Sequence, residues 1–417
     1  MLVVSGMTFL RAKSLFLGCL TAFVCCLTLL GCQKSGKKQK LWGGDEEEKL
    51  QVAVPASFTA DSIQKLTVKL DSVFRHFHKK RGFNGTVLVT KYDKVIYKNA
   101  FGLADFFKKD SLTVETAFQL ASVSKQFTAM AIMMLKEEGE LNYEDSVQQY
   151  LPDFPYHGIT IRQLLTHQSG LSNYTYFSDK LWPNRNKNLT NEDVIQLMVT
   201  HRPQPYYPPN THFDYSNTGY SLLASIVEKV SEKPFAEFLR ERIFDPLEMK
   251  HTFTYSPDLL TLTGKIATGH TRFRQKRTTD YLDTVLGDKG VYSTVEDLYK
   301  WDQALYTQKL VKHETLAEAF TGGILHKKKN QTEDYGFGWR IRPLDNGDTA
   351  VYHGGLWHGF STYFLRNPKE HSALIVLSNL PNGSFSYLQD LRKFLYPAHP
   401  DSIAHKEQKL AVRGRRR

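Results

Sequence analysis

The chain has 417 residues, 41% hydrophobic and 23% charged, with a formal net charge of +11. These values are ordinary for a globular protein of one large or two closely joined domains, with enough residues for a real core. All four cysteines lie within the first 32 residues, which excludes a disulfide framework or a cysteine metal site in the remainder.

The first segment has the pattern of an export signal. Arg11 and Lys13 precede an uncharged run over 14–31, which ends in Leu-Leu-Gly-Cys before the polar stretch "QKSGKKQK". This ending resembles a bacterial lipobox, which implies a signal peptide over 1–31 and a lipid on Cys32. An uncleaved membrane anchor is the alternative. Either interpretation predicts an exported body, and the first predicts lipid anchoring in the cell envelope, on the periplasmic or the surface side.

Polar and mixed-charge residues over 32–60 predict a tether, and one domain is expected over 61–397. The remaining residues, 398–417, form a basic tail with six Lys or Arg against two acids over 401–417. A solvated, disordered tail and a contact with an anionic surface are both compatible with this composition. No aromatic residue interleaves with the basic ones, so no nucleic-acid partner is expected.

Within the domain, the predicted elements begin with a helix and a hairpin. Apolar residues recur at helical spacing over 62–80, and two strand-like runs over 85–105 meet at a turn around Tyr92–Asp93. A helix-rich middle follows. Thr160 and Gln163 have the spacing of a capping box, with Gly170 as a stop, and Ser293 and Glu296 repeat that spacing.

The last third of the domain reads as strands. They are expected over 334–343, 349–356, 360–368 and 372–380, with a closing helix over 386–396. Strands therefore come first and last, with helices between them, including two helices over 219–244 broken near Pro234. This order predicts an α+β fold: one antiparallel sheet shared by both ends of the chain, flanked by N- and C-terminal helices, with an inserted all-helical lobe.

One serine–lysine pair begins a strongly apolar helix. Ser122 and Lys125 lie three residues apart in "FQLASVSKQFTAMAI", so the amine can reach the hydroxyl, and the free N–H groups of a first helical turn favour an oxyanion. The same spacing occurs at Ser35/Lys38 in the tether and at Ser62/Lys65 on a polar helix. The pair alone is therefore weak, and a helix-capping serine beside a surface lysine stays open.

Candidate partners lie downstream. Tyr215 and Asn217 stand two apart at a turn leading into a helix, and a tyrosine can serve as a base only with help from its surroundings. His353 is expected at a strand edge, followed by glycines that admit close approach of a substrate backbone. Pairing His353 with His358 as metal ligands lacks a third ligand at known spacing, so no metal is expected.

Taken in order, Ser-x-x-Lys, Tyr-x-Asn and His-x-Gly resemble the penicillin-recognising serine hydrolases, on the branch of class C β-lactamases, D-alanyl-D-alanine carboxypeptidases and family VIII esterases. Similar stretches are spread over residues 83 to about 395, including "TIRQLLTHQSGLSNY" and "KGVYSTVEDLYKW". The resemblance implies a β-lactamase/transpeptidase-like fold, an acyl-enzyme mechanism, no cofactor, and a small-molecule or peptide substrate.

The resemblance also implies roles for individual residues. Ser122 is the nucleophile, Lys125 its proton partner, and Tyr215 the general base or proton shuttle. Asn217 positions Lys125 and the substrate. The third motif supplies His353, expected to bond to Tyr215 and to the substrate, together with Gly355 and Leu356. The backbone N–H groups of Ser122 and Leu356 would form the oxyanion hole.

Two departures leave the substrate open. The third motif is His-Gly-Gly rather than Lys-Thr-Gly, which replaces a permanent cation by an imidazole and removes a hydroxyl. Asn210 stands where a glycine is common, although asparagine tolerates the left-handed conformation. Peptidase, esterase and β-lactamase activity are therefore not separated. A non-catalytic β-lactam or peptide sensor is the alternative, and a structural envelope protein is a third.

The neighbouring motifs are expected to be mainly scaffold. His167 in "LLTHQSGL" is expected to be structural, at a helix end. Tyr174, Tyr176 and Trp182 either line a substrate entrance or cover the helical lobe. Asp288 and Lys289 precede Gly290 near the expected cleft, with no role assigned.

Overall fold

The computed structural model describes residues 49–258, 265–324, 332–381 and 385–398, with no side-chain description for 385–387. The predicted signal peptide, Cys32, most of the tether and nearly all of the basic tail lie outside these ranges. Among the described residues, no helix is long and apolar enough to cross a membrane.

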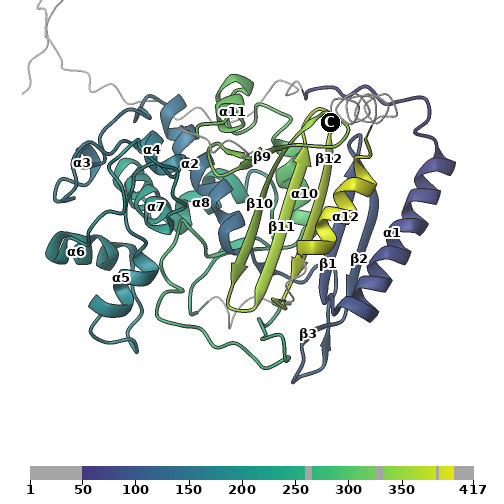
Figure 1. The fold of residues 1–417 in the computed structure, drawn as a ribbon, viewed down its shortest axis with the longest axis horizontal. Coiled ribbons are helices and arrows are strands. Elements are labelled where there is room, and N and C mark those ends of the chain that lie inside the picture. The colour runs from purple at the N-terminus through teal and green to yellow at the C-terminus, as the bar shows by residue number, and fades with distance from the viewer. Residues whose placement is uncertain (1–48, 259–264, 325–331, 382–384, 399–417) are drawn as a thin grey trace, which may run out of the picture. The chain divides into compact units, whose positions relative to one another are not determined.

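A seven-stranded antiparallel sheet joins the two ends of the domain, in the order β2-β1-β12-β11-β10-β9-β8 (Figure 1). N-terminal β1 pairs directly with C-terminal β12, and Gly85 stands opposite Ser378. The shared sheet predicted from the strand order is confirmed. The strands are β1 (Gly85–Lys91), β2 (Lys94–Phe101), β8 (Asp334–Tyr335), β9 (Arg340–Pro343), β10 (Thr349–Trp357), β11 (Phe360–Asn367) and β12 (Ser372–Ser378).

The predicted hairpin turn joins β1 to β2. Tyr92 and Asp93 have φ values of +50° and +62°, as a two-residue turn between twisted antiparallel strands requires. A second contact fixes the same turn, because the Asp93 carboxylate lies 3.2 Å from the His371 imidazole at the start of the neighbouring β12 hairpin. The two hairpins therefore hold one another in register.

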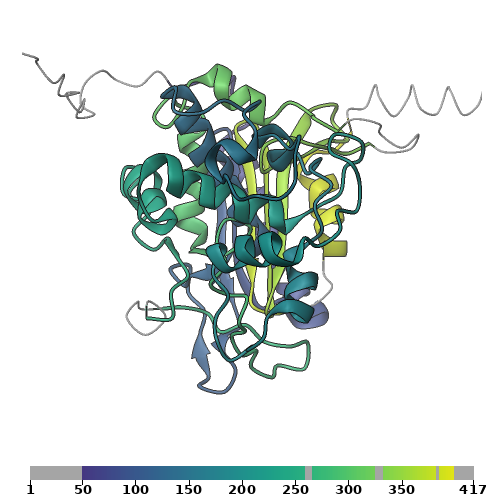
Figure 2. The same ribbon diagram turned by 90° about the vertical axis from the view of Figure 1, so that its left-hand side faces the viewer.

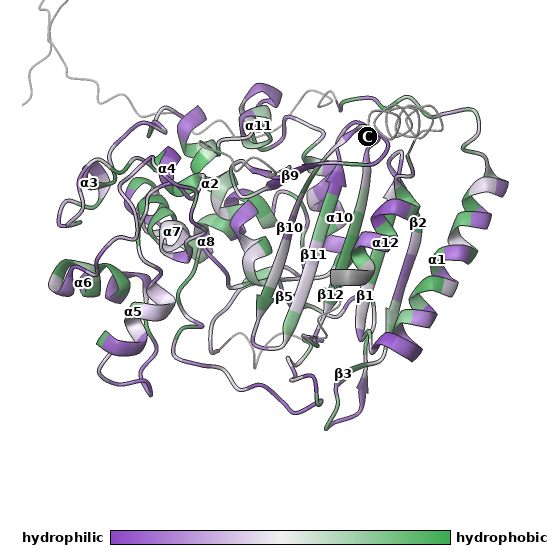
Figure 3. Cartoon of the chain, viewed as in Figure 1, coloured by the Kyte–Doolittle hydropathy of each residue, from purple (hydrophilic) through white to green (hydrophobic). Residues whose placement is uncertain are grey.

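Helices cover both faces of the sheet. The flanking helices α1 (Ala60–Arg81) and α12 (Phe385–Leu395) lie on one face, where Leu70, Phe74 and Leu391 join a core with inward residues of the strands (Figure 1). α10 (Val295–Ala304) lies on the other face. Every residue of β11 and β12 is buried, and β1 and β12 are mainly hydrophobic in Figure 3, as expected of central strands covered on both sides.

The helical lobe is inserted between the first and last strands and lies nearest the viewer in Figure 2. Apolar side chains of its helices join those of the sheet in one large core. Its elements are α2 (Lys125–Glu137), α3 (Val147–Tyr150), α4 (Ile161–Leu165), α5 (Tyr174–Leu181), α6 (Asn191–His201), α7 (Asn217–Ser231), α8 (Phe235–Leu239), the π-helical turn η2 (Arg240–Phe244) and α11 (His313–Ala319).

Helix termini test the capping predictions. The Thr160 and Gln163 box is present at α4, but that helix ends at Leu165, so Gly170 is not its stop. The box predicted at Ser293 and Glu296 is wrong by one residue. Ser293 ends strand β7 and bonds to Thr252, so the N-cap passes to the next residue, whose side chain accepts from the Asp297 N–H.

Two small sheets and the start of the described chain complete the body. β3 (Leu103–Asp105) pairs with β4 (Asp110–Ser111), and β7 (Val291–Ser293) lies between β5 (Phe118–Gln119) and β6 (Phe253–Thr254). The Leu50 N–H donates to the Tyr306 carbonyl at 2.9 Å, and Lys49 forms an ion pair with Asp93 at 3.1 Å. The described end of the predicted tether is therefore bound to the body rather than free.

Candidate active site

Ser122 lies in a tight turn rather than in the first turn of an α-helix. It belongs to the 3₁₀ turn η1 (Ala121–Ser124), and the helix begins three residues later, at Lys125. Ala121, directly before the serine, has a φ of +49°, a left-handed conformation that costs about 1–3 kcal/mol for a residue other than glycine. This strained turn directs the serine into a pocket, which Ser122 lines.

Lys125 is fully buried, and its Nζ has three hydrogen-bonding neighbours. Nζ lies 3.4 Å from Ser122 Oγ, 2.8 Å from Asn217 Oδ1 and 2.8 Å from the backbone carbonyl of Asp288. An ammonium would donate to all three, whereas an amine would donate to the two carbonyl oxygens and accept from the Ser122 hydroxyl. The structure thus brings together Ser122, Lys125 and Asn217 from η1, α2 and the first residue of α7, as the motif order predicts.

Tyr215 lies over the same lysine. Lys125 Nζ is 4.9 Å from the centroid of the Tyr215 ring, and the phenol oxygen is buried without a hydrogen-bond partner among the described residues. His167 supports this turn, because its Nδ1 accepts from the Ser216 N–H at 3.2 Å and its ring lies 4.3 Å from that of Tyr215. His167 therefore positions Tyr215, in keeping with its expected structural role.

His353 is engaged differently from the prediction. Its Nε2 lies 3.0 Å from the hydroxyl of Tyr335 and its Nδ1 lies 2.7 Å from the Gly354 carbonyl. A carbonyl can only accept, so Nδ1 carries the proton and Nε2 accepts from Tyr335. The predicted bond from His353 to Tyr215 is therefore wrong: the two rings are 6.0 Å apart, and both imidazole nitrogens already have partners.

The charge of His353 follows from its surroundings. Burial lowers the pKa of His353 well below its usual value, and the nearby charges of Arg340 and Lys125 act in the same direction. Burial has the same effect on the pKa of His167, again helped by Lys125. Both imidazoles are neutral at pH 7, so the third motif supplies no cation of its own.

Close packing requires a glycine at position 355 of the third motif. A Cβ at Gly355 would stand 2.3 Å from the Leu120 carbonyl oxygen and 2.4 Å from Thr362 Oγ1. Only glycine lets β10 pack this closely against the nucleophile turn. In the described residues β9 pairs with β10 only as far as Tyr352, so the stretch from His353 through Leu356 forms an open strand edge beside Ser122.

A cavity of about 520 Å³ opens over this edge. Among the described residues three arginines line it and no carboxylate does: Arg340 and Arg342 from β9, and Arg392 from α12. Arg342 pairs with Glu333 at 3.2 Å, whereas the guanidinium of Arg340 lies 5.4 Å from the Tyr215 ring centroid and has no acid partner among the described residues. The cavity is therefore electropositive on the side that leads to α12.

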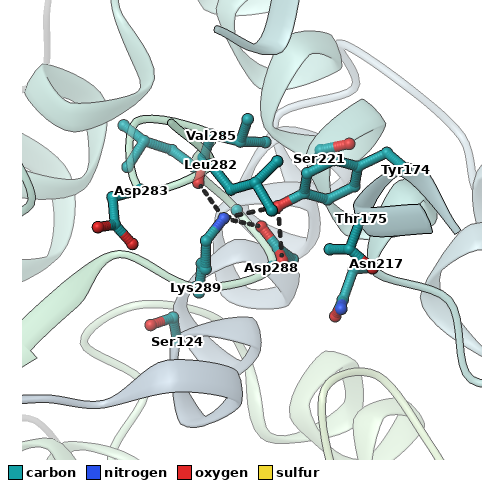
Figure 4. A network of polar contacts seen from close by, with 12 residues as sticks. Ser124, Tyr174, Thr175, Asn217, Ser221, Leu282, Asp283, Val285, Asp288 and Lys289 are labelled. Carbon is teal, nitrogen blue, oxygen red and sulfur yellow. Dashed lines mark hydrogen bonds and ion pairs between the residues drawn. The ribbon is translucent and has the colours of Figure 1, made fainter. Parts of the chain in front are cut away.

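A buried polar network adjoins the lysine (Figure 4). Lys289 Nζ donates to the hydroxyl of Tyr174 at 2.6 Å and to the Val285 carbonyl at 3.0 Å, and the Tyr174 hydroxyl donates to Asp288 Oδ2 at 3.1 Å. Tyr174 is fully buried and does not line the cavity, whereas Tyr176 is exposed. Of the two roles left open for Tyr174, covering the helical lobe is the one the structure shows.

Sequence reasoning missed Tyr335 and Arg340. A tyrosine and an arginine in a strand read as an ordinary core residue and an ordinary edge residue, and no spacing links either to His353. The described residues contain no group of three or more His, Cys, Asp or Glu arranged to hold a metal ion.

The fold and the motif geometry are those of a penicillin-recognising serine hydrolase. Residues 70–395 match the family model described as Beta-lactamase. The chain is 36% identical over 323 residues to a penicillin-binding protein of Bacillus subtilis, and the match covers 74% of this chain and 71% of the relative. The chain therefore belongs to the β-lactamase family, and the resemblance and the fold class inferred from the motifs are confirmed.

Two solved structures share the fold. An octameric penicillin-binding protein homologue from Pyrococcus abyssi superposes with a TM-score of 0.70 at 27% identity, covering 80% of this chain and 78% of that chain. A penicillin binding protein from Bacillus halodurans gives a TM-score of 0.68 at 25% identity, covering 77% and 98% respectively. Both likenesses extend over most of the described domain.

Proposed function

We propose that this protein is a serine hydrolase that forms an acyl-enzyme on Ser122 from an amide or an ester. The observation that carries the proposal is the buried Lys125 amine, held 2.8 Å from Asn217 Oδ1 and 3.4 Å from Ser122 Oγ, both of which belong to residues that line the cavity. A serine hydroxyl becomes an effective nucleophile only when a neighbouring group takes its proton, and this arrangement provides one.

The proposed reaction has two steps. Ser122 Oγ bonds to the substrate carbonyl carbon while its proton passes to Lys125 in its unprotonated amine form, and Tyr215 relays that proton to the leaving amine or alcohol as the bond to this group breaks. Water then attacks the ester carbonyl and gives a proton to the Lys125 amine; the bond to Ser122 Oγ breaks, Oγ takes that proton, and the acid is released. The N–H groups of Ser122 and Leu356 are the proposed oxyanion donors, and a donor of this kind is typically worth about 2.7–4 kcal/mol of barrier.

Intact-mass measurement after exposure to a fluorophosphonate and to a β-lactam tests the proposal. A β-lactam is a suitable probe because the relatives are penicillin-binding proteins. We expect the wild type to gain one adduct and Ser122→Ala none. Ser62→Ala, which removes the serine of another Ser-x-x-Lys pair in the chain, is the matched control and should label like the wild type. Folded wild type that labels with neither probe would favour the sensor alternative.

The substrate proposed is a D-amino-acid peptide or an ester with a negative charge near the reacting carbonyl. The three arginines of the cavity support this choice, since an electropositive wall attracts anions. Paired p-nitrophenyl esters test it, one with a neutral acyl chain and one ending in a carboxylate. We expect kcat/KM for the charged ester alone to fall in Arg340→Gln. An equal effect on both esters would remove the charge preference from the proposal.

Attachment of the protein to a bacterial envelope membrane through lipid on Cys32 is likewise proposed. It is supported by the export-signal pattern and by the Leu-Leu-Gly-Cys ending of the apolar run.

A further inference from the structure

Asp288 and Lys289 form a buried charged pair that none of the proposed chemical steps uses. Their side chains are 3% exposed each, and Lys289 Nζ lies 3.5 Å from Asp288 Oδ1. Neither residue lines the cavity, so neither is placed to touch a substrate. Removing two charges from water is costly, and apolar residues of similar volume usually fill such a place at least as well. The pair therefore needs an explanation beyond packing.

The Lys289 ammonium connects three separate segments of the chain. Tyr174 from α5 accepts its shortest bond, and the Val285 carbonyl of the preceding loop accepts another (Figure 4). The Trp357 ring at the end of β10 lies 5.0 Å away. The same loop reaches β10 a second time, because Trp357 Nε1 donates to Asp283 at 2.6 Å. The cation thus sits between the helical lobe and the strand that carries the third motif.

The network reaches the proposed proton-transfer group through one carbonyl. Lys125 Nζ donates at 2.8 Å to the backbone oxygen of Asp288. This carbonyl lies between Gly287 and Gly290, whose φ values are +100° and +99°. Glycine restricts backbone rotation least of all residues, so contacts made by the side chains of Asp288 and Lys289 help to fix the direction of this carbonyl.

The ends of the same loop are docked on the nucleophile segment. Thr128 of α2 donates to the Gly287 carbonyl at 2.7 Å, and the Val291 N–H donates to Ser124 Oγ at 3.1 Å. The loop therefore forms the wall against which Lys125 lies, and its middle is held by Lys289. Displacing that middle would change the position of the amine relative to Ser122 without touching either residue.

We propose that Lys289 is a positioning residue that, together with Asp288 and Tyr174, holds the Asp288 carbonyl against Lys125 and so sets the distance between the amine and the serine hydroxyl. The inference rests on the proposed acylation of Ser122. The network of Lys289, Asp288 and Tyr174 connects the helical lobe with β10, and it acts on the serine only through Lys125.

The test removes both charges together. Lys289→Met alone would leave the Asp288 carboxylate buried without its partner, so the informative variant is Lys289→Met with Asp288→Asn. We expect its acylation rate constant with a fluorophosphonate, and its kcat for an ester, to fall about 10- to 100-fold, because a small misplacement of a reacting group has an effect of this size. KM should change by less than about twofold, since the pair does not line the cavity.

The pH profile separates positioning from stability. The titratable groups facing Lys289 are Asp288, Asp283, Lys125 and Tyr174, and burial lowers the pKa of Lys289 itself. We expect the midpoint of the pH–kcat profile to move by at least about half a pH unit in the double variant. Lys91→Met is the matched control, because it breaks an ion pair between Lys91 and Glu370 in which each side chain is 13% exposed. Neither residue lines the cavity, so kcat and the pH profile should stay unchanged.

The outcomes separate the two proposals. Failure of wild-type protein to label at Ser122 would contradict the proposed function itself. Labelling of wild type and double variant at equal rates, with the same pH midpoint, would overturn only the positioning role. Tyr174→Phe, which removes one hydroxyl, keeps the inference testable if the double variant does not fold: a kcat loss of about threefold or more supports it, and a wild-type kcat contradicts it.

Discussion

His167 and His353 are both buried close to the Tyr215 ring. Their ring centroids lie 4.3 Å and 6.0 Å from that of Tyr215. Burial is the first cause that lowers both pKa values, and Lys125 adds to it in each case. The fold therefore keeps two histidines neutral near Lys125, which avoids accumulating positive charge around Ser122.

This arrangement predicts how stability depends on pH. Unfolded histidine takes up a proton near pH 6.5, whereas the folded imidazoles resist it, so the unfolded state binds more protons below that pH. The contribution of the two histidines to the free energy of unfolding is therefore complete above about pH 6.5. It falls on acidification, by up to about 1.4 kcal/mol per pH unit for each histidine.

The measurement is urea unfolding at several pH values between about 5 and 8, for wild type and His167→Asn. Asparagine offers an oxygen in place of Nδ1 to accept from the Ser216 N–H. We expect the free energy of unfolding of the variant to fall less steeply with acidification than that of the wild type, by up to the contribution of one histidine. This expectation holds whatever the overall stability of the variant. An unchanged slope would mean that His167 binds protons equally in the folded and unfolded protein, against the direction inferred from its burial.

The Ser122 pair also shows what a residue's surroundings add to a short motif. Ser62 and Lys65 have identical spacing, but that lysine pairs with Asp61 at 2.6 Å while both side chains are about three-quarters exposed. Lys125 is fully buried among acceptors from three segments. Spacing predicts that two residues share a helix face; burial and partners distant in sequence decide whether they form a site.

At the scale of elements, β10 packs closely against the nucleophile turn η1, with Gly355 at the contact. Gly355→Ala would place a methyl group 2.3 Å from the Leu120 carbonyl oxygen, and the atom it meets is backbone that cannot rotate away. The strand and the turn must then separate, which moves the proposed oxyanion donors apart.

We expect Gly355→Ala to lower the rate constant for acylation by about 100-fold or more, as loss of preorganised geometry does. Stopped-flow or time-resolved mass labelling with a fluorophosphonate measures this. Thr349→Ala, at the exposed start of the same strand, is the matched control and should stay within about twofold of wild type. Wild-type acylation by the alanine variant would show that β10 is not part of the oxyanion site.

Element by element, local patterns were reliable where local chemistry decides the outcome. Thr160 and Gln163 cap α4 as predicted because both partners lie within one helical turn. The N-cap of α10 lies one residue later than predicted, because Ser293 belongs to strand β7 and its hydroxyl bonds to that of Thr252, 41 residues away. The same limit hid Tyr335 and the bond between Lys289 and Tyr174, which spans 115 positions.

At the scale of the whole molecule, the proposed lipid on Cys32 would hold the protein at an envelope membrane. Cys32 lies outside the described residues, whereas Lys49 is already paired with Asp93 of the body. We expect palmitate to label the wild type in bacterial cells and the label to be lost in Cys32→Ala. Cys26→Ala, in the same apolar run, is the matched control and should keep it. Label that persists without Cys32 would contradict lipid attachment there.

The adjacency of β1 and β12 also governs how the chain can fold. Gly85 cannot find its partner Ser378 until almost the whole domain has been synthesised, so the sheet closes late and its formation is dominated by contacts distant in sequence. Until then β1 has only β2 beside it and presents an open edge to other chains. We infer that truncations that remove β12 give aggregating rather than partly active protein, even when every motif residue is retained.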